Sequence, residues 1–268
     1  FFLPKSFSTP YHDSKIILKK SSFESNIGYC FGYHDKTPFS GDGLKLLSMK
    51  INHNNVDPLS EGKHIELGFF SYPFHEKSSF NSFSSTQTWC WQQGCMLQWD
   101  PKNKSNRVYY NALVEGEFGS HLYDINESKI IKKIKSPIYS INPNGENFLT
   151  INFSRLDRFR PGYGYNNFSN VKLSNCPTDD GLFLQNFSSD SKKLIAPIRE
   201  LANNFSYNPE DSHYINHATF SPNGDKISFF YIISSKNKRK IIFTIFDLNN
   251  ESYSFLEADR NTSHYCWQ

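Results

Sequence analysis

Short runs of alternating apolar and polar residues, separated by turn signals, fill most of this chain. Residues 220–227 (FSPNGDKI) show the basic unit, in which an apolar strand end leads through a turn into a second strand. The proline fixes φ, and the Asn-Gly pair tolerates φ > 0, so the chain reverses at little steric cost. Alternation with a period of two on both sides of such a turn predicts an antiparallel hairpin.

The same turn recurs along the chain. Residues 39–47 (FSGDGLKLL) and 141–149 (INPNGENFL) repeat it, and residues 99–110 (WDPKNKSNRVYY) are a looser copy with a longer turn. Residues 264–268 (HYCWQ) match residues 217–221 (HATFS) in the spacing from histidine to aromatic. A second hairpin-like stretch follows each copy, at residues 64–70, 120–125, 181–187 and 240–248. Four-stranded antiparallel units repeated every roughly 40–60 residues indicate the blades of a β-propeller.

We therefore predict an all-β fold, with one β-propeller domain over residues 1–268. The approximate blades are residues 30–85, 88–137, 138–200 and 212–260, with the start of a further blade at 263. About four to five blades make a partial ring, because closed propellers use roughly 4–8. The alternative is a two-sheet sandwich, which also has short strands and regular turns. The fixed place of the turn within each unit favours the propeller.

Composition and charge narrow the function classes. The net charge is only +3 and the lysines are scattered, which argues against a nucleic-acid partner. The five cysteines are odd in number and lack Cys-x-x-Cys spacing, so we expect reduced thiols. No apolar run reaches the roughly 18 residues that span a bilayer. Residues 1–6 (FFLPKS) lack the basic region of a signal peptide, so we expect a cytoplasmic protein. Nothing indicates an oligomeric state.

Histidines precede two of the predicted inner strands. The first strand of each propeller blade lines the central channel, and His217 and His264 each stand three residues before an aromatic residue. We therefore expect both imidazoles to face one axial funnel, with Asn216 beside them and His213 at its mouth. Two or three histidines from separate strands suit a divalent transition metal. The alternative is that these histidines form hydrogen bonds between neighbouring blades.

A cationic and aromatic stretch follows the second strand of the third unit, at residues 155–165 (RLDRFRPGYGY). Arginine forks bind carboxylates through two hydrogen bonds, and we expect tyrosine faces to stack on sugar rings. An acidic oligosaccharide or polysaccharide is therefore the expected partner. The alternative is a solvated loop in which Arg158 pairs with Asp157. The candidate residues are Arg155, Arg158, Arg160, Tyr163 and Tyr165.

Two other segments precede inner strands. Gln93 lies in residues 86–99, which hold three of the four tryptophans. Tryptophans at this density are typical of packing between blades, whereas Gln93 is expected to face the channel. His34 and Asp35 occupy the corresponding place in the first blade, and an imidazole beside a carboxylate predicts an oriented acid–base pair.

The motif residues also carry a resemblance. Residues 220–226 resemble the strand–turn signature of TolB-like and WD40-like propellers. Residues 216–224 (NHATFSPNG) and 263–267 (SHYCW) are similar to elements of the oligogalacturonate lyase family. In that family several histidines and a glutamine hold manganese, and a further histidine acts as base. The resemblance implies that His217 and His264 are metal ligands. It departs from the family at residues 265–266, where a paired His-x-His is replaced by a single histidine followed by Tyr-Cys.

Two functions follow. The first is a metal-dependent uronate lyase of the oligogalacturonate type, in which a metal and an arginine neutralise the carboxylate and a histidine removes the C5 proton for β-elimination. The second is a non-catalytic propeller that binds a glycan or a protein partner through its channel face. The fold supports both. The expected catalytic residues are His34, Asp35, Arg155 and Arg158; the substrate-binding residues are Arg160, Tyr163, Tyr165, Gln93 and Asn216; and the metal ligands, with manganese as the possible ion, are His217, His264 and His213.

Overall fold

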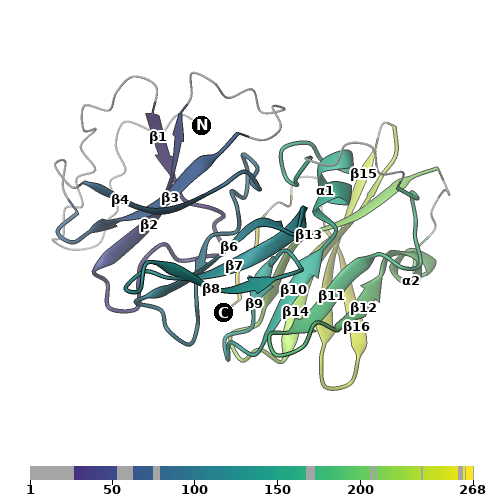
Figure 1. Ribbon diagram of the computed structural model, residues 1–268. Helices are drawn as coiled ribbons and strands as arrows, with labels where there is room; N and C mark the ends of the chain where they lie inside the picture. Colours follow the sequence, from purple (N-terminus) through teal and green to yellow (C-terminus); the bar gives the residue numbers. More distant parts are fainter. Residues whose placement is uncertain are drawn as a thin grey trace, which may run out of the picture.

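The chain folds as a β-propeller of four-stranded antiparallel blades in the computed structural model (Figure 1). The structure describes residues 27–52, 63–74, 79–166, 173–205, 208, 210–236, 238–258, 262 and 264–267. Four sheets lie within these residues, and each follows the order of the chain from its inner to its outer strand. The predicted fold class is confirmed, and the sandwich alternative is excluded.

Blades 1 and 2 come from the first half of the described chain. Blade 1 consists of β1 (Ile27–Cys30), β2 (Lys45–Asn52), β3 (Ile65–Ser71) and β4 (Phe80–Thr86). Blade 2 consists of β5 (Gln98–Trp99), β6 (Arg107–Val114), β7 (Glu117–Asp124) and β8 (Lys129–Ile134).

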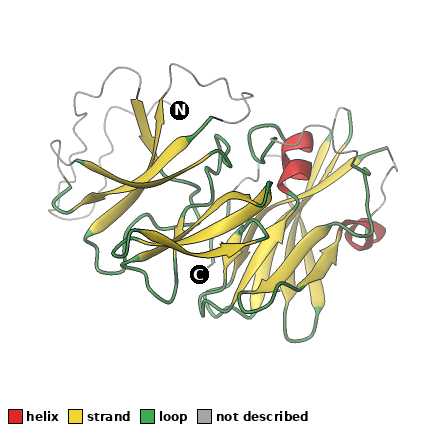
Figure 2. Ribbon diagram, in the orientation of Figure 1, coloured by secondary structure: helices red, strands yellow, loops and turns green. Residues whose placement is uncertain are grey.

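The helices lie within blade 3 and in the connection from blade 3 to blade 4. Blade 3 consists of β9 (Ser140–Ile141), β10 (Asn147–Ile151), β11 (Gly181–Asn186) and β12 (Lys192–Pro197). Blade 4 consists of β13 (Ser212–Phe220), β14 (Lys226–Ser234), β15 (Arg239–Asp247) and β16 (Ser252–Ala258). Helix α1 (Phe153–Phe159) follows β10, and α2 (Ile198–Asn203) follows β12, as the red ribbons of Figure 2 show. None of the helices in the described part of the chain is long and apolar enough to cross a membrane.

The repeated turn closes with the same two backbone hydrogen bonds in every blade. In blade 4, Ser221 N–H donates to the Lys226 carbonyl at 2.8 Å, and Gly224 N–H donates to the Ser221 carbonyl at 2.9 Å. Corresponding pairs close the turns that begin at Ser40, Asp100 and Asn142. The glycine of the turn has φ of +72° at Gly43, +68° at Gly145 and +75° at Gly224, a region that other residues enter at a cost.

The turns of successive blades touch one another. Gly41 N–H in blade 1 donates to the Lys104 carbonyl in blade 2 at 2.9 Å. Asn142 Nδ2 in blade 3 donates to the Gly224 carbonyl in blade 4 at 3.0 Å. The turns therefore lie at one end of the propeller, at equivalent positions in successive sheets, as the repeats predict.

Apolar side chains fill the spaces between blades. Leu47 of blade 1 and Val108 of blade 2 belong to one buried cluster, and Tyr109 of blade 2 and Phe148 of blade 3 belong to another. A third and larger cluster joins blade 3 to blade 4 and includes Phe229, which is fully buried. Burial of a side chain of this size stabilises the fold by about 1.5–3 kcal/mol, so packing of sheet on sheet holds the blades together.

The predicted further blade begins where the chain returns to blade 4. Residues 264–267 are irregular, and Tyr265 packs its ring against Phe230 and Phe243 with centroids 5.2 and 4.7 Å away. The Tyr265 hydroxyl lies within hydrogen-bond distance of the carbonyls of Ser228 and His217, either of which can accept its one hydrogen. This segment is thus fixed against the inner part of blade 4, and a further blade stays a prediction.

The contact between turns can be tested with two glycine substitutions. A Cβ at Gly224 would lie 2.4 Å from Asn142 Oδ1, whereas a Cβ at Gly116, at φ +87°, has nothing within 4 Å. Both positions have positive φ, so Gly116→Ala should lower the free energy of unfolding by about 1 kcal/mol. Gly224→Ala should lower it by about 2 kcal/mol, because it also breaks the hydrogen bond between turns. Urea denaturation of the two variants measures the difference, and equal losses would contradict the proposed contact.

Candidate functional site

Three histidines from distant parts of the chain meet at the inner strands. His34 follows β1, His217 lies in β13, and His264 lies in the segment that returns to blade 4. The ring centroids of His34 and His264 are 4.4 Å apart, and those of His217 and His264 are 6.2 Å apart. The centroid of His34 lies 6.3 Å from that of His217. The structure thus brings together His217 and His264, which each stand three residues before an aromatic residue in the sequence. It also places His34 next to them.

Tyr33 sits among the three imidazoles, and sequence reasoning missed it. Its ring stacks on His217 and His264 with centroid distances of 5.0 and 5.7 Å. Its hydroxyl lies 3.2 Å from His264 Nε2, and burial raises the Tyr33 pKa to about 12. The sequence signal that could have pointed to Tyr33 was its position directly before the candidate residue His34. We call Tyr33, His34, His217 and His264 the histidine cluster.

A β-bulge in β13 aims His217 at the cluster. The register with β14 shifts between Asn216 and Thr219, and His217 has φ of +56°. In a regular strand, side chains 216 and 217 would point to opposite faces. The bulge instead allows Asn216 Nδ2 to reach His217 Nε2 at 3.2 Å. Bulges often redirect side chains near functional sites, and alternation of apolar residues in the sequence does not reveal them.

A buried hydrogen-bond network supports the cluster, and we call it the Asn216 network. Asn216 Oδ1 accepts from Gln93 Nε2 at 3.1 Å and from the Tyr139 hydroxyl at 2.7 Å. The Tyr139 oxygen in turn accepts from His217 N–H at 2.8 Å. Gln93 Nε2 also donates to the Tyr163 carbonyl at 3.0 Å. Gln93 and Asn216 therefore lie beside the cluster and link blades 2, 3 and 4, and Gln93, which was expected to face the channel, is buried.

Two residues of the predicted cationic stretch reach the cluster. The Arg160 guanidinium lies 3.7 Å above the centre of the Tyr163 ring, in a cation–π contact. The Tyr163 ring stands perpendicular to His217, with centroids 6.5 Å apart. Arg160 is close enough for its charge to lower the pKa of His217.

Burial keeps two of the histidines neutral. Desolvation is the main cause that lowers the His217 pKa to about 3, with the Arg160 charge as the next cause. Desolvation also lowers the pKa of His34, against the opposing effect of Asp35. Because both values lie below 6.5, both imidazoles are uncharged at neutral pH and retain a lone pair for accepting a proton or a hydrogen bond.

Asp35 takes a different partner from the one expected. Its Oδ2 lies 2.8 Å from Lys36 Nζ, with the two side chains only 16 % and 7 % exposed. Lys36 Nζ also lies 5.7 Å from the Tyr139 ring centre. Among the described residues, the cation paired with Asp35 is thus Lys36, and Asp35 acts on His34 through its charge. The oriented His34–Asp35 acid–base pair stays a prediction.

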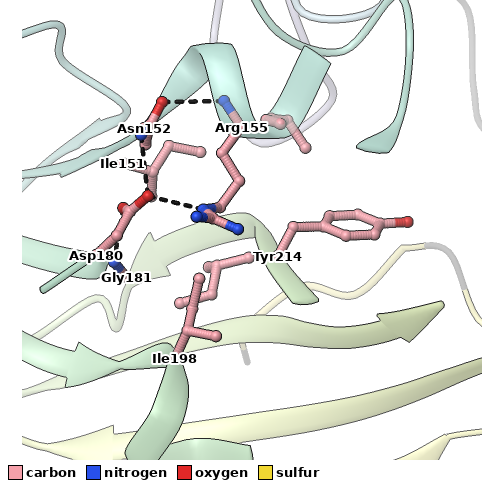
Figure 3. Close-up of a pocket in the computed structure, with 9 residues that line it drawn as sticks. Ile151, Asn152, Arg155, Asp180, Gly181, Ile198 and Tyr214 are labelled. Carbon is pink, nitrogen blue, oxygen red and sulfur yellow. Dashed lines mark hydrogen bonds and ion pairs between the residues drawn. The ribbon is translucent and has the colours of Figure 1, made fainter. Parts of the chain in front are cut away.

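Arg155 belongs to a structural ion pair instead of the cluster (Figure 3). Its Nε lies 2.7 Å from Asp180 Oδ2, and its other nitrogens donate to the carbonyls of Ser174 and His213. The side chain is buried, and the adjoining cavity of about 10 Å³ has room for roughly one water molecule. Arg155 and Arg158 lie on α1, where Asn152 caps the first turn by accepting from Arg155 N–H. The first half of the expected loop is therefore helical.

Three other predicted residues also lie away from the cluster's contacts. His213 is buried, with Nδ1 2.6 Å from the Tyr231 hydroxyl and its ring stacked on that tyrosine. Tyr165 is buried against Phe153 and accepts from Asn111 Nδ2 at 2.9 Å, so it is a core residue. Arg158 is exposed in the last turn of α1. The partners of His213 and Tyr165 in these contacts lie outside the histidine cluster.

A larger groove of about 790 Å³ lies between blades 2 and 3. Several charged groups that line it are already engaged within the protein. Asp180 forms an ion pair with Arg155. Lys135 Nζ lies 2.8 Å from Glu115 Oε2, and Lys192 Nζ lies over the Phe183 ring. The histidine cluster, with Arg160 beside it, is therefore the stronger candidate for binding chemistry.

The donor atoms of the cluster do not fit a metal ion. The Tyr139 oxygen accepts from His217 N–H and its proton is donated to Asn216 Oδ1, so Asn216 Nδ2 faces His217 and donates to Nε2. His264 Nε2 is likewise engaged by the Tyr33 hydroxyl. Over the described ranges, no group of three or more His, Cys, Asp or Glu side chains could hold a metal.

Comparison with known proteins identifies no family for this chain. No protein-family profile and no curated protein matches the chain. A structure of a prolyl endopeptidase is 8 % identical, with a TM-score of 0.48, over 89 % of this chain and 29 % of that one. An oligogalacturonate lyase in complex with manganese is 10 % identical, with a TM-score of 0.42, over 86 % and 66 %.

The propeller domain of the Trilobed protease from Pyrococcus furiosus is 9 % identical, with a TM-score of 0.39, over 83 % of this chain and 68 % of that one. The chain therefore spans less than a third of the prolyl endopeptidase and about two thirds of the other two. Manganese in the lyase structure is a property of that protein, and the fold of this chain is established by its own four sheets.

The buried His213 predicts acid sensitivity. Desolvation lowers its pKa from 6.5 to about 4 in the folded protein, so the unfolded chain takes up the proton first. Stability from this residue is complete above pH 6.5 and is lost as the pH falls toward 4, by on the order of 3 kcal/mol. His213→Gln should therefore show a weaker fall in unfolding free energy between pH 7 and pH 4.5 than the wild type. Parallel curves in urea denaturation would show that His213 does not titrate in this way.

Proposed function

We propose that the protein binds an acidic carbohydrate at the histidine cluster. The observation that carries this proposal is the convergence of the Arg160–Tyr163 stack with three imidazoles and Tyr33. Guanidinium, imidazole and phenol groups offer hydrogen bonds to hydroxyl and carboxylate oxygens, and aromatic faces offer apolar surface to sugar rings.

The charge of the site favours a single carboxylate on the bound sugar unit. Asp35 and Lys36 neutralise each other, and the low pKa values leave His34 and His217 uncharged. Arg160 has no ion-pair partner among the described residues, so its charge is available to a ligand. Its stack on Tyr163 holds the plane of the guanidinium while its edge N–H groups remain free to bind both oxygens of a carboxylate.

The binding proposal predicts a large effect of one substitution. Arg160→Gln removes the charge and the paired hydrogen bonds, and should weaken binding of trigalacturonate about 10- to 100-fold. Isothermal titration calorimetry at low salt measures this change. Lys133→Gln is the matched control, because Lys133 is an exposed cation on the outer strand β8. Equal affinity of the two variants would refute the role of Arg160, and no binding by the wild type would refute the function.

Uronate lyase activity is a second candidate, and the neutral imidazole of His34 favours it. His34 is exposed, and its lowered pKa leaves it able to accept a proton at neutral pH. In a β-elimination its imidazole would take the C5 proton, the C5–H electrons would form the C4=C5 double bond, and the C4–O bond would break. The leaving oxygen would take a proton, for which the nearby Tyr33 hydroxyl is the candidate donor.

Turnover can be separated from binding by following the ultraviolet absorbance of the unsaturated product. Wild-type protein with oligogalacturonate should form this product, and His34→Gln should lower kcat at least about 100-fold, as expected for loss of a general base. The dissociation constant should change little, since Arg160 remains. If the wild type binds the sugar and forms no product, the protein is a binding module and the lyase proposal fails.

A further inference from the structure

Two buried polar atoms, one in the histidine cluster and one beside it, have no hydrogen-bond partner among the described residues. His217 is 6 % exposed and Gln93 is 1 % exposed. Among the described residues, His217 Nδ1 and Gln93 Oε1 have no hydrogen-bond partner. Both side chains bond to Asn216, so the two unsatisfied atoms belong to one network. Buried polar atoms are normally paired, and exceptions inside a network of this kind point to a missing partner such as water or ligand.

The network determines which chemical group each atom needs. Because Asn216 Nδ2 donates to His217 Nε2, the neutral imidazole carries its hydrogen on Nδ1. His217 Nδ1–H is therefore a donor that needs an acceptor. Gln93 uses Nε2 to donate to Asn216 Oδ1 and the Tyr163 carbonyl. Gln93 Oε1 is therefore an acceptor that needs a donor.

We infer that His217 Nδ1–H donates to the carboxylate of a bound uronic acid and that Gln93 Oε1 accepts from a hydroxyl of the same sugar. A uronic acid carries an anionic acceptor and hydroxyl donors on one ring, so it satisfies both atoms. This inference rests on the proposed function and specifies it further. It gives His217 the role of a hydrogen-bond donor in place of a metal ligand.

The local backbone is arranged for this role. The bulge and the positive φ of His217 turn its ring out of the regular alternation of β13 and against Tyr33. The rings of the exposed residues His34 and His264 lie beside the buried His217 ring, with centroids 6.3 and 6.2 Å away. Because Nδ1 is buried, the inferred contact requires side chains of the cluster to move on binding. An ordered water at Nδ1 is the competing occupant, and the experiment below is designed to exclude it.

Two amide substitutions separate the ring nitrogens of His217. Asparagine places its side-chain nitrogen near the position of Nδ1 and tolerates positive φ, whereas glutamine reaches toward the position of Nε2 and leaves Nδ1 empty. The probes are trigalacturonate and its methyl ester, which lacks the charge. His217→Gln should reduce the preference for the acid over the ester about 10-fold, and His217→Asn should keep it within about threefold. His121→Gln in blade 2 is the control for loss of a histidine.

The outcomes distinguish this inference from the proposed function. If Arg160→Gln weakens binding but both His217 variants keep the wild-type preference, only the inference fails and Nδ1 holds a water. Equal loss of preference in both variants also overturns it, because the donor position would then be irrelevant. A measurement on the unmutated protein is independent of folding of the variants: long-range ¹H–¹⁵N NMR should find the His217 hydrogen on Nδ1. A hydrogen on Nε2 would overturn the inference.

Discussion

The rest of the site depends on the hydrogen bonds that the side-chain amide of Asn216 forms. Its oxygen accepts from Gln93 of the segment before β5 and from Tyr139 before β9, and its nitrogen donates to His217 within β13. One amide therefore joins three blades. Because these groups are buried, each hydrogen bond fixes the direction of the next, and the position of the proton on His217 follows from the network.

The fold could be predicted from the sequence because its information is local. A turn such as residues 221–224 requires only a few neighbouring residues, and the same hydrogen bonds close every copy. Helix α1 was not predicted, because the local sequence signals for it are weak. Asn152 caps the helix, but the helix is only seven residues long and lies between strands. Its packing against β13, not local propensity, stabilises so short a helix.

The site could be predicted only in part. Equal spacing before an aromatic residue predicted that His217 and His264 would face one funnel, and their ring centroids lie 6.2 Å apart although residues 264–267 form no strand. The same reasoning could not show that Arg155 pairs with Asp180, which lies 25 residues away in the sequence. An arginine in a cationic stretch looks alike in sequence whether it is exposed, like Arg158, or buried in an ion pair. Reasoning from the sequence also could not reveal the β-bulge between Asn216 and Thr219, which places His217 in different surroundings from His213.

The proposed recognition of an anion at this site depends on how many hydrogen bonds a neutral imidazole can form. Each neutral ring has one lone pair, and in His217 the Asn216 amide uses it. Coordination of a metal would require breaking this bond and leaving the amide of Asn216 with an unsatisfied buried donor, which is costly. The same bond places a hydrogen on the opposite ring nitrogen. The network that disfavours a metal thus supplies an N–H donor. In the proposed function, this donor and the Arg160 charge together attract the carboxylate that a metal would otherwise attract.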